Sequence, residues 1–249
     1  MLGYIYRPPW SILLIKKRSG ILKKSFEKLV SEKQEKILNA AYEEFTEKGY
    51  QAASTNKIVK NAGIGKGTLF YYFHNKQDLF EYLIDESIEI TFKEYLNKID
   101  YSETDIFKRL IQVGQLKKEV YKQFDIPVTF FINILLNLES VDFLSKDLIK
   151  TRAEAEKYVE DILKRNIDYS KFKEEISAPK AVQLIYWAIE GYRLDLEKRV
   201  QQKEENNFTR QEIEEYYADF YEYMHILQIA FYKTEYTSLL SEGNNDEST

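Results

Sequence analysis

Apolar residues recur at intervals of three and four positions along most of the chain, which is the period of an amphipathic helix. In the N-terminal part this pattern predicts a helix over 31–49, a short helix over 54–62 and another over 66–73. Ser31, with a glutamine three positions later, is predicted to cap the first helix. A glycine follows each of the first two helices, as at many helix ends. Two short helices joined by a three-residue turn predict a helix-turn-helix head.

Longer amphipathic stretches fill the rest of the chain. They are predicted to begin near residues 75, 102, 127, 153, 179 and 209, and the last reaches about residue 232. No run alternates long enough to build a sheet, so the sequence predicts an all-α protein. We expect a head over 31–78, a larger helical domain over 79–240 and a polar, disordered tail over 241–249. Residues 1–30 show no sustained period and predict either a disordered extension or a basic arm.

Composition argues against several classes of site and location. The chain has no cysteine, which excludes disulfides and cysteine-based metal sites and makes the cytoplasm the expected location. The only histidines, His74 and His225, lie far apart, so no metal site is expected. No apolar run approaches the length of a membrane span, so no membrane partner is expected. Because no nucleophile with a base and no carboxylate pair is recognisable, we expect neither catalytic residues, nor an enzyme, nor a cofactor.

Charge divides the chain into two unequal parts. Residues 1–79 hold 14 Lys/Arg and 7 Asp/Glu, whereas residues 80–249 hold 22 and 34, and the net charge is −5. A basic head on an acidic body predicts that a polyanion binds the head.

The stretch Ser54 to Phe73, STNKIVKNAGIGKGTLFYYF, contains both short helices and their turn. Its apolar positions are predicted to form a small core with the first helix, which leaves one face of the helix over 66–73 free. A helix of this width fits the major groove of B-form DNA, and its N-terminal N–H groups can meet phosphate. The predicted core comprises Ile58, Ala62, Ile64, Leu69 and Phe73 with Ile37, Ala41 and Phe45.

In its order and spacing, this segment closely resembles the DNA-binding head of the TetR/AcrR family of bacterial regulators. The resemblance covers about residues 32–83, including Gly49-Tyr50 and the Lys-x-x-Leu of residues 76–79. It implies a protein that binds a double-stranded DNA operator. The residues implied to contact DNA are Thr55, Asn56, Lys66, Gly67, Thr68, Tyr71, Tyr72 and Lys76.

Some of these positions have a second interpretation or depart from the family pattern. Tyr72 can instead belong to the core of the head. Phe70 and Gly65 stand where the family commonly has Tyr and Ser, which removes two possible phosphate donors. Affinity is then expected to rest more on lysines, including a basic arm along DNA with Lys23, Lys24 and Lys28 as its best candidates.

The resemblance also implies a ligand cavity in the larger helical domain and a homodimer formed by its last two long helices. Aromatic residues there suit a small lipophilic effector. The candidate ligand residues are Phe124, Phe130, Phe131, Tyr158, Tyr186, Trp187 and Glu190. Glu190 either meets a cationic ligand or is a hydrogen-bonded or exposed residue at the dimer edge. The apolar stripe expected at the dimer comprises Ile213, Tyr217, Phe220, Met224, Leu227 and Phe231.

Together these features predict a ligand-responsive transcriptional regulator, a repressor that an effector releases from a pseudo-palindromic operator. The alternative is a DNA-bound adaptor of the same fold that recruits a partner protein and has no small-molecule effector.

Overall fold

Helices and their connecting turns make up the part of the chain that the computed structural model describes, which is residues 25–136, 157–201 and 210–237. Over these residues there is no β-strand, only an isolated bridge between Phe172 and Tyr232. The predicted all-α class is confirmed. None of the helices in these ranges is long and apolar enough to span a membrane. The predicted tail over 241–249 lies outside the described residues.

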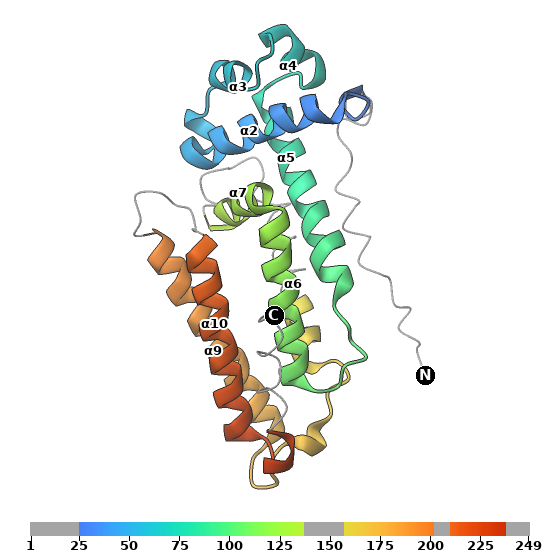
Figure 1. Ribbon diagram of the computed structural model, residues 1–249, viewed down its shortest axis with the longest axis vertical. Coiled ribbons are helices and arrows are strands. Elements are labelled where there is room, and N and C mark those ends of the chain that lie inside the picture. The colour runs from blue at the N-terminus through green and yellow to red at the C-terminus, as the bar shows by residue number, and fades with distance from the viewer. Residues whose placement is uncertain (1–24, 137–156, 202–209, 238–249) are drawn as a thin grey trace, which may run out of the picture. The chain divides into compact units, whose positions relative to one another are not determined.

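The first of two compact units contains the described residues up to 90 and the segment 124–136. Its helices are α2 (Ser31–Ala52), α3 (Thr55–Asn61), α4 (Lys66–Tyr72), α5 (Lys76–Ile90) and α7 (Asp125–Leu136) (Figure 1). α2 packs on α3, α5 and α7, and α3 packs on α4. Phe130 of α7 is fully buried between the rings of Tyr42 and Phe80, so a segment distant in sequence completes this core.

The second unit contains residues 91–123 and the described residues from 157 onwards. It begins with a π-helical turn, η2 (Thr91–Tyr95), and a 3₁₀ turn, η3 (Leu96–Lys98). Its long helices are α6 (Ile106–Gln123), α9 (Ala178–Gln201) and α10 (Arg210–Phe231), with 3₁₀ turns η6 (Tyr169–Lys171) and η7 (Thr234–Tyr236) (Figure 1). This division in space does not follow the boundary at residue 79 given by the sequence, and that functional boundary stays a prediction.

The packing of α10 differs from the prediction made for its apolar stripe. Ile213, Tyr217, Phe220 and Met224 are buried within the single chain, and α10 packs on α6. At the closest approach, a Cβ on Gly114 of α6 would lie 3.2 Å from the rings of Phe220 and Tyr221. These four residues therefore serve the core of this unit, and their assignment to the dimer was wrong. Leu227 and Phe231 of the same stripe are half-buried, and their role stays a prediction.

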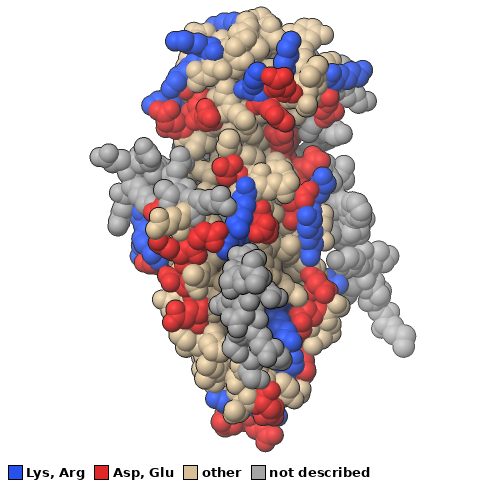
Figure 2. Space-filling view, in the orientation of Figure 1, with Lys and Arg blue, Asp and Glu red and all other residues tan. Residues whose placement is uncertain are grey.

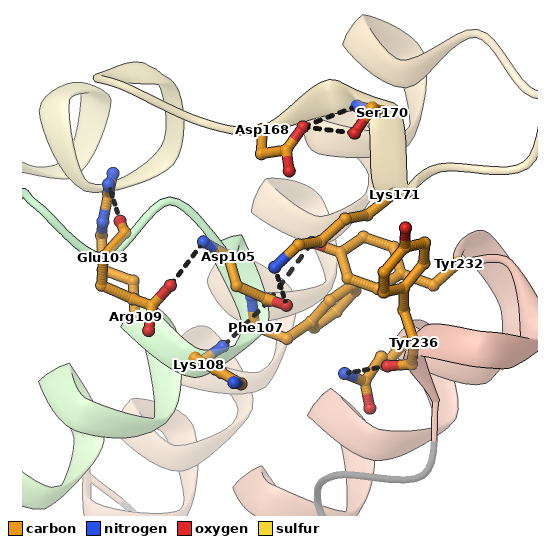
Figure 3. Close-up of polar contacts among 11 residues, drawn as sticks. Glu103, Asp105, Phe107, Lys108, Arg109, Asp168, Ser170, Lys171, Tyr232 and Tyr236 are labelled. Atoms are coloured by element: carbon orange, nitrogen blue, oxygen red, sulfur yellow. Dashed lines mark hydrogen bonds and ion pairs between the residues drawn. The ribbon is translucent and has the colours of Figure 1, made fainter.

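Buried polar side chains tie the start of α6 to the turns around it. Asp105 caps α6 by accepting from the Phe107 N–H at 3.0 Å, and its carboxylate also binds Lys171 at 2.9 Å and the Tyr232 hydroxyl at 3.2 Å (Figure 3). Arg109, fully buried, donates to backbone carbonyls of residues 101, 103, 162 and 165. These contacts to fixed backbone and carboxylate acceptors define where the loops meet the helix.

The start of α2 also differs from prediction. Val30 occupies the N-cap position without a side-chain cap, and Ser31 is already helical. Gln34 does not close a capping box, because its amide donates to the Phe26 carbonyl at 2.6 Å. Residues before Ser31 thus take part in the packing of this unit, and Phe26 is fully buried.

Candidate DNA interface

The segment 54–73 forms the two short helices and the tight turn that its sequence predicts. Gly63 ends α3 in the left-handed conformation, with φ of +66°, which residues with a Cβ rarely adopt. The N–H groups of Gly63 and Ile64 then donate to carbonyls in the last turn of α3, at 3.2 and 3.0 Å. This turn sets the direction in which α4 leaves α3.

A buried core lies under one side of α3 and α4. Ile58, Leu69 and Phe73 are each less than 5% exposed, and Ala62 lies beside them. Ile37, Ala41 and Phe45 of α2 are buried as well, as predicted, whereas Ile64 is only half-buried. The apolar side of each short helix is therefore buried in this core, and the other side of α4 faces outward.

The outward side of α4 carries most of the residues predicted to contact DNA. Lys66, Gly67 and Thr68 in its first turn are exposed, and Tyr71, one turn later, is 65% exposed. A Cβ on Gly67 would meet no atom within 4 Å, so the protein itself does not require glycine there. At the start of α3, Thr55 is half-buried and Asn56 is exposed. A row of small and hydrogen-bonding side chains on an exposed helix is chemically suited to base edges and phosphates.

Tyr72 was predicted either to contact DNA or to belong to the core of the head, and the structure shows features of both. Its side chain is half-buried, its ring meets that of Tyr71 at 5.0 Å, and it makes an edge contact with Phe26 at 5.4 Å. Phe26 also packs on Phe73 and on Tyr82 of α5, at 5.0 and 5.5 Å between ring centroids. No periodic signal marks Phe26, since a single phenylalanine in an irregular segment has no pattern. Phe26 thereby holds the end of α4 against α5.

Lys76, predicted to bind phosphate, is also engaged within the head. Its ammonium donates to the carbonyls of Gln51 and Ala53, at 3.1 and 3.2 Å, and lies 4.8 Å from the centre of the Tyr50 ring. These contacts join the start of α5 to the end of α2 beside α3. The positive charge stays near the α3–α4 surface, and its contact with phosphate stays a prediction.

Glu44 is a positioning residue that the sequence reasoning missed. Its carboxylate, 3% exposed, accepts from the Ser54 N–H at 2.9 Å and pairs with Lys57 at 3.4 Å. A negative charge beside the N-terminus of α3 is favourable because the first N–H groups of a helix are unpaired. The available signal was an acidic residue on the line of Ala41 and Phe45, where the pattern of α2 calls for an apolar one.

The positive charge of the head is distributed unevenly. Residues 25–79 hold eight Lys/Arg and seven Asp/Glu, so most of the basic excess lies in residues 1–24, outside the described part. Figure 2 accordingly shows both Lys/Arg and Asp/Glu over the part of the surface that belongs to α2–α4. Of the arm candidates, only Lys28 is described, and it is exposed.

The predicted ligand residues are divided between the two units. Phe124, Phe130 and Phe131 belong to the first unit, whereas Tyr158, Tyr186, Trp187 and Glu190 belong to the second. Of the first group, Phe130 is a core residue, and Phe124 and Phe131 are half-buried.

In the second unit, Tyr158 meets Phe92 at 5.8 Å, Tyr186 is half-buried, and Trp187 is 60% exposed. Glu190 forms an ion pair with Arg193 at 2.8 Å. A hollow of about 270 Å³ along α6, lined by residues including Lys98, Gln112 and Glu119, contains none of the predicted ligand residues. Their role in binding stays a prediction.

Comparison with known proteins agrees with this geometry. The family model of bacterial regulatory proteins, tetR family, matches residues 37–83, which contain α3, the turn and α4. An uncharacterized HTH-type transcriptional regulator of Bacillus subtilis is 41% identical over 64 residues, 26% of this chain and 31% of its own length. The match thus spans about a third of that relative.

Two longer similarities extend beyond the head. The fatty acid metabolism regulator protein of Bacillus subtilis is 26% identical over 162 residues, 62% of this chain and 78% of that protein. A crystal structure of a TetR family transcriptional regulator from Chloroflexus aurantiacus shares the fold with a TM-score of 0.58 and 19% identity, over 84% of this chain and 98% of that one. The helix-turn-helix head, residues 37–83, thus matches the tetR family of bacterial regulatory proteins, and the chain shares its fold with a TetR family regulator.

Proposed function

We propose that the protein is a homodimeric repressor that binds a pseudo-palindromic DNA operator and leaves it when a small lipophilic effector binds the second unit. The observation that supports DNA binding is the exposed side of α4. Gly67, Thr68 and Tyr71 stand on a helix whose opposite side is buried, within the segment that matches the family model. Two such helices in a two-fold dimer suit two half-sites about one helical turn of DNA apart.

An exposed apolar face on α9 and α10 supports the dimer. Leu184, Trp187 and Leu194 of α9 are 46–60% exposed in the single chain. On α10, Tyr223, Ile226 and Ile229 are 48–51% exposed and lie opposite the stripe that packs on α6. Within the chain, α9 and α10 meet through the stacked rings of Tyr192 and Tyr216, 4.8 Å apart. Several large apolar side chains exposed on neighbouring helices are typical of a protein–protein interface.

The effector class is proposed from chemistry and from one relative. A relative that is similar over 162 residues is named for fatty acid metabolism, and the second unit is rich in tyrosine and phenylalanine. An apolar cavity lined by aromatic residues suits a lipophilic molecule. An effector that prefers the state unable to bind DNA would release the operator, and by linkage DNA would weaken effector binding equally.

The first test is fluorescence anisotropy with DNA from upstream of the protein's own gene and with a scrambled sequence, over a salt series. We expect tight, sequence-selective binding whose affinity falls steeply with salt, because Lys and Arg release counterions from phosphate. Tyr71→Phe serves as a matched control for Tyr71→Ala, since it keeps the ring. Absence of binding to any DNA at low salt would contradict the proposal.

The dimer has a separate test by light scattering coupled to size exclusion. Ile226→Asp places a charge on the exposed face of α10 and is expected to give monomers, whereas Ile226→Leu is expected to stay dimeric. Wild-type protein that is monomeric at micromolar concentration, or an unaffected Ile226→Asp dimer, would refute this interface.

A further inference from the structure

One lysine lies on the packed side of α6. This helix buries Leu110, Val113, Gly114 and Val120, which recur at three- and four-residue spacing. Lys117 is four residues after Val113 and three before Val120, so it lies on the same line as these buried residues. An apolar residue is expected at this position, and a charged one needs an explanation.

Lys117 nevertheless remains accessible to solvent. It is exposed, although its ammonium lies 5.4 Å from the centre of the ring of Tyr95 in η2, which is itself only 9% exposed. α6 runs alongside α10 in this unit (Figure 1). The accessibility of a side chain on this side of α6 indicates an open space beside it within the unit.

The groups that act on Lys117 come from three other elements of the same unit. The pKa of its ammonium is raised, chiefly by Tyr95 of η2, while removal from bulk water works in the opposite direction. Tyr216 of α10 and Glu190 of α9 add to the increase. Lys117 therefore remains a cation, and groups of η2, α9 and α10 act on its charge.

Within the described ranges, no carboxylate pairs with the Lys117 ammonium, whereas its neighbours on α6 are paired. Lys118 forms an ion pair with Glu214, and Lys122 pairs with Glu119 and Glu214. Glu190, the acidic residue that acts on Lys117, is bound to Arg193. Among the residues that the structure describes, none forms a salt bridge to Lys117. Lys117 is thus an accessible cation that its surroundings stabilise, and a cation with a shifted pKa and no bound anion is a candidate binding group.

We propose that Lys117 binds the carboxylate of the effector, which is then a lipophilic acid whose apolar part fills the space beside α6. This deepens the proposed function and rests on it. The Tyr95 hydroxyl accepts from the Lys117 ammonium and can donate its own hydrogen to a bound carboxylate. A charge-assisted pair of this kind discriminates an acid from the corresponding alcohol. The charge of such a ligand is opposite to that of the cationic ligand considered for Glu190.

Isothermal titration calorimetry on the full chain without DNA tests this directly. The probes are dodecanoate, 1-dodecanol and dodecanoyl-CoA, each below its micelle concentration, so that a free carboxylate is compared with a neutral head and with a thioester. The variants are Lys117→Met, which keeps the length of the side chain without its charge, and Lys122→Met on the same helix as the control. Replacing a partly enclosed cation by an apolar residue is not expected to unfold the chain, and a thermal melt verifies this.

The wild type is expected to bind dodecanoate at least about tenfold more tightly than dodecanol, the factor that one hydrogen bond to a charged group supplies. Lys117→Met is expected to remove this preference by weakening binding of the acid alone, whereas Lys122→Met retains it. Equal binding of acid and alcohol by the wild type, a preference that survives in Lys117→Met, binding of the thioester alone, or no binding of any probe would each overturn the proposal. Binding of the acid through Lys117 without any effect on operator affinity would instead refute effector release and leave this site intact.

Discussion

Phe26 offers a sharp test of how the DNA-binding head is held together. It lies outside the residues that match the family model, yet it is fully buried against Tyr72, Phe73 and Tyr82. A buried phenylalanine removes on the order of 150–200 Å² from water. At about 25 cal/mol per Å² this corresponds to about 4–5 kcal/mol of transfer free energy. Measured Phe→Ala costs in protein cores are about 3–5 kcal/mol.

We expect Phe26→Ala to lower the free energy of unfolding of the head by about 3 kcal/mol, the lower end of that range, since a segment at the edge of the domain can relax. Urea denaturation of the full chain followed by circular dichroism measures it, and the transition of the head should move to lower urea. Operator binding should weaken at urea concentrations that the wild type tolerates, because Phe26 supports Tyr72 next to Tyr71.

The matched control is Val30→Ala in the same segment, where the side chain is 68% exposed. Substitution of an exposed residue is expected to change stability by less than about 0.5 kcal/mol. If Phe26→Ala and Val30→Ala unfold at the same urea concentration, residues 25–30 do not belong to the head and the reasoning fails.

Three further predictions concern the same head. Glu44→Ala leaves the partly buried Ser54 N–H without its acceptor and should cost about 1 kcal/mol in urea denaturation, whereas Ala at the exposed Glu43 should cost little. Equal costs would contradict the role given to Glu44. Gly63→Ala, at φ of +66°, should lower the free energy of unfolding by about 1–2 kcal/mol. Gly67→Ala should leave the thermal melt unchanged and weaken operator binding. A Gly63→Ala variant as stable as the wild type would show that the turn tolerates a Cβ. Lys76→Ala should weaken binding to operator and scrambled DNA alike and reduce the salt slope of binding by about one. It should also lower the melting temperature, because the Gln51 and Ala53 carbonyls lose their donor. Tyr71→Ala should instead reduce discrimination between the two DNAs; identical behaviour of these last two variants would show that α4 is phased incorrectly.

The sequence by itself determined the elements of the head. Local patterns sufficed because each depends on neighbouring residues: glycine permits the left-handed turn at Gly63, and the Asn75 side chain accepts from the Asp78 N–H at the start of α5. The spacing of Ile58, Leu69 and Phe73 likewise fixed which side of α3 and α4 is buried. The exposed side of α4, which carries the proposed function, followed from the same alternation.

Tertiary structure decided what local patterns leave open. α10 is apolar or aromatic on two sides, so its period alone could not tell the side that packs on α6 from the side that stays exposed. Glu44 and Lys117 are charged residues on apolar lines, and only the three-dimensional neighbours show that one caps α3 and the other adjoins an open space. Phe26 has no periodic context and gains its importance from rings on two helices distant in sequence. The physical reason is the same in each case: these roles depend on contacts between residues far apart along the chain, which no local spacing encodes.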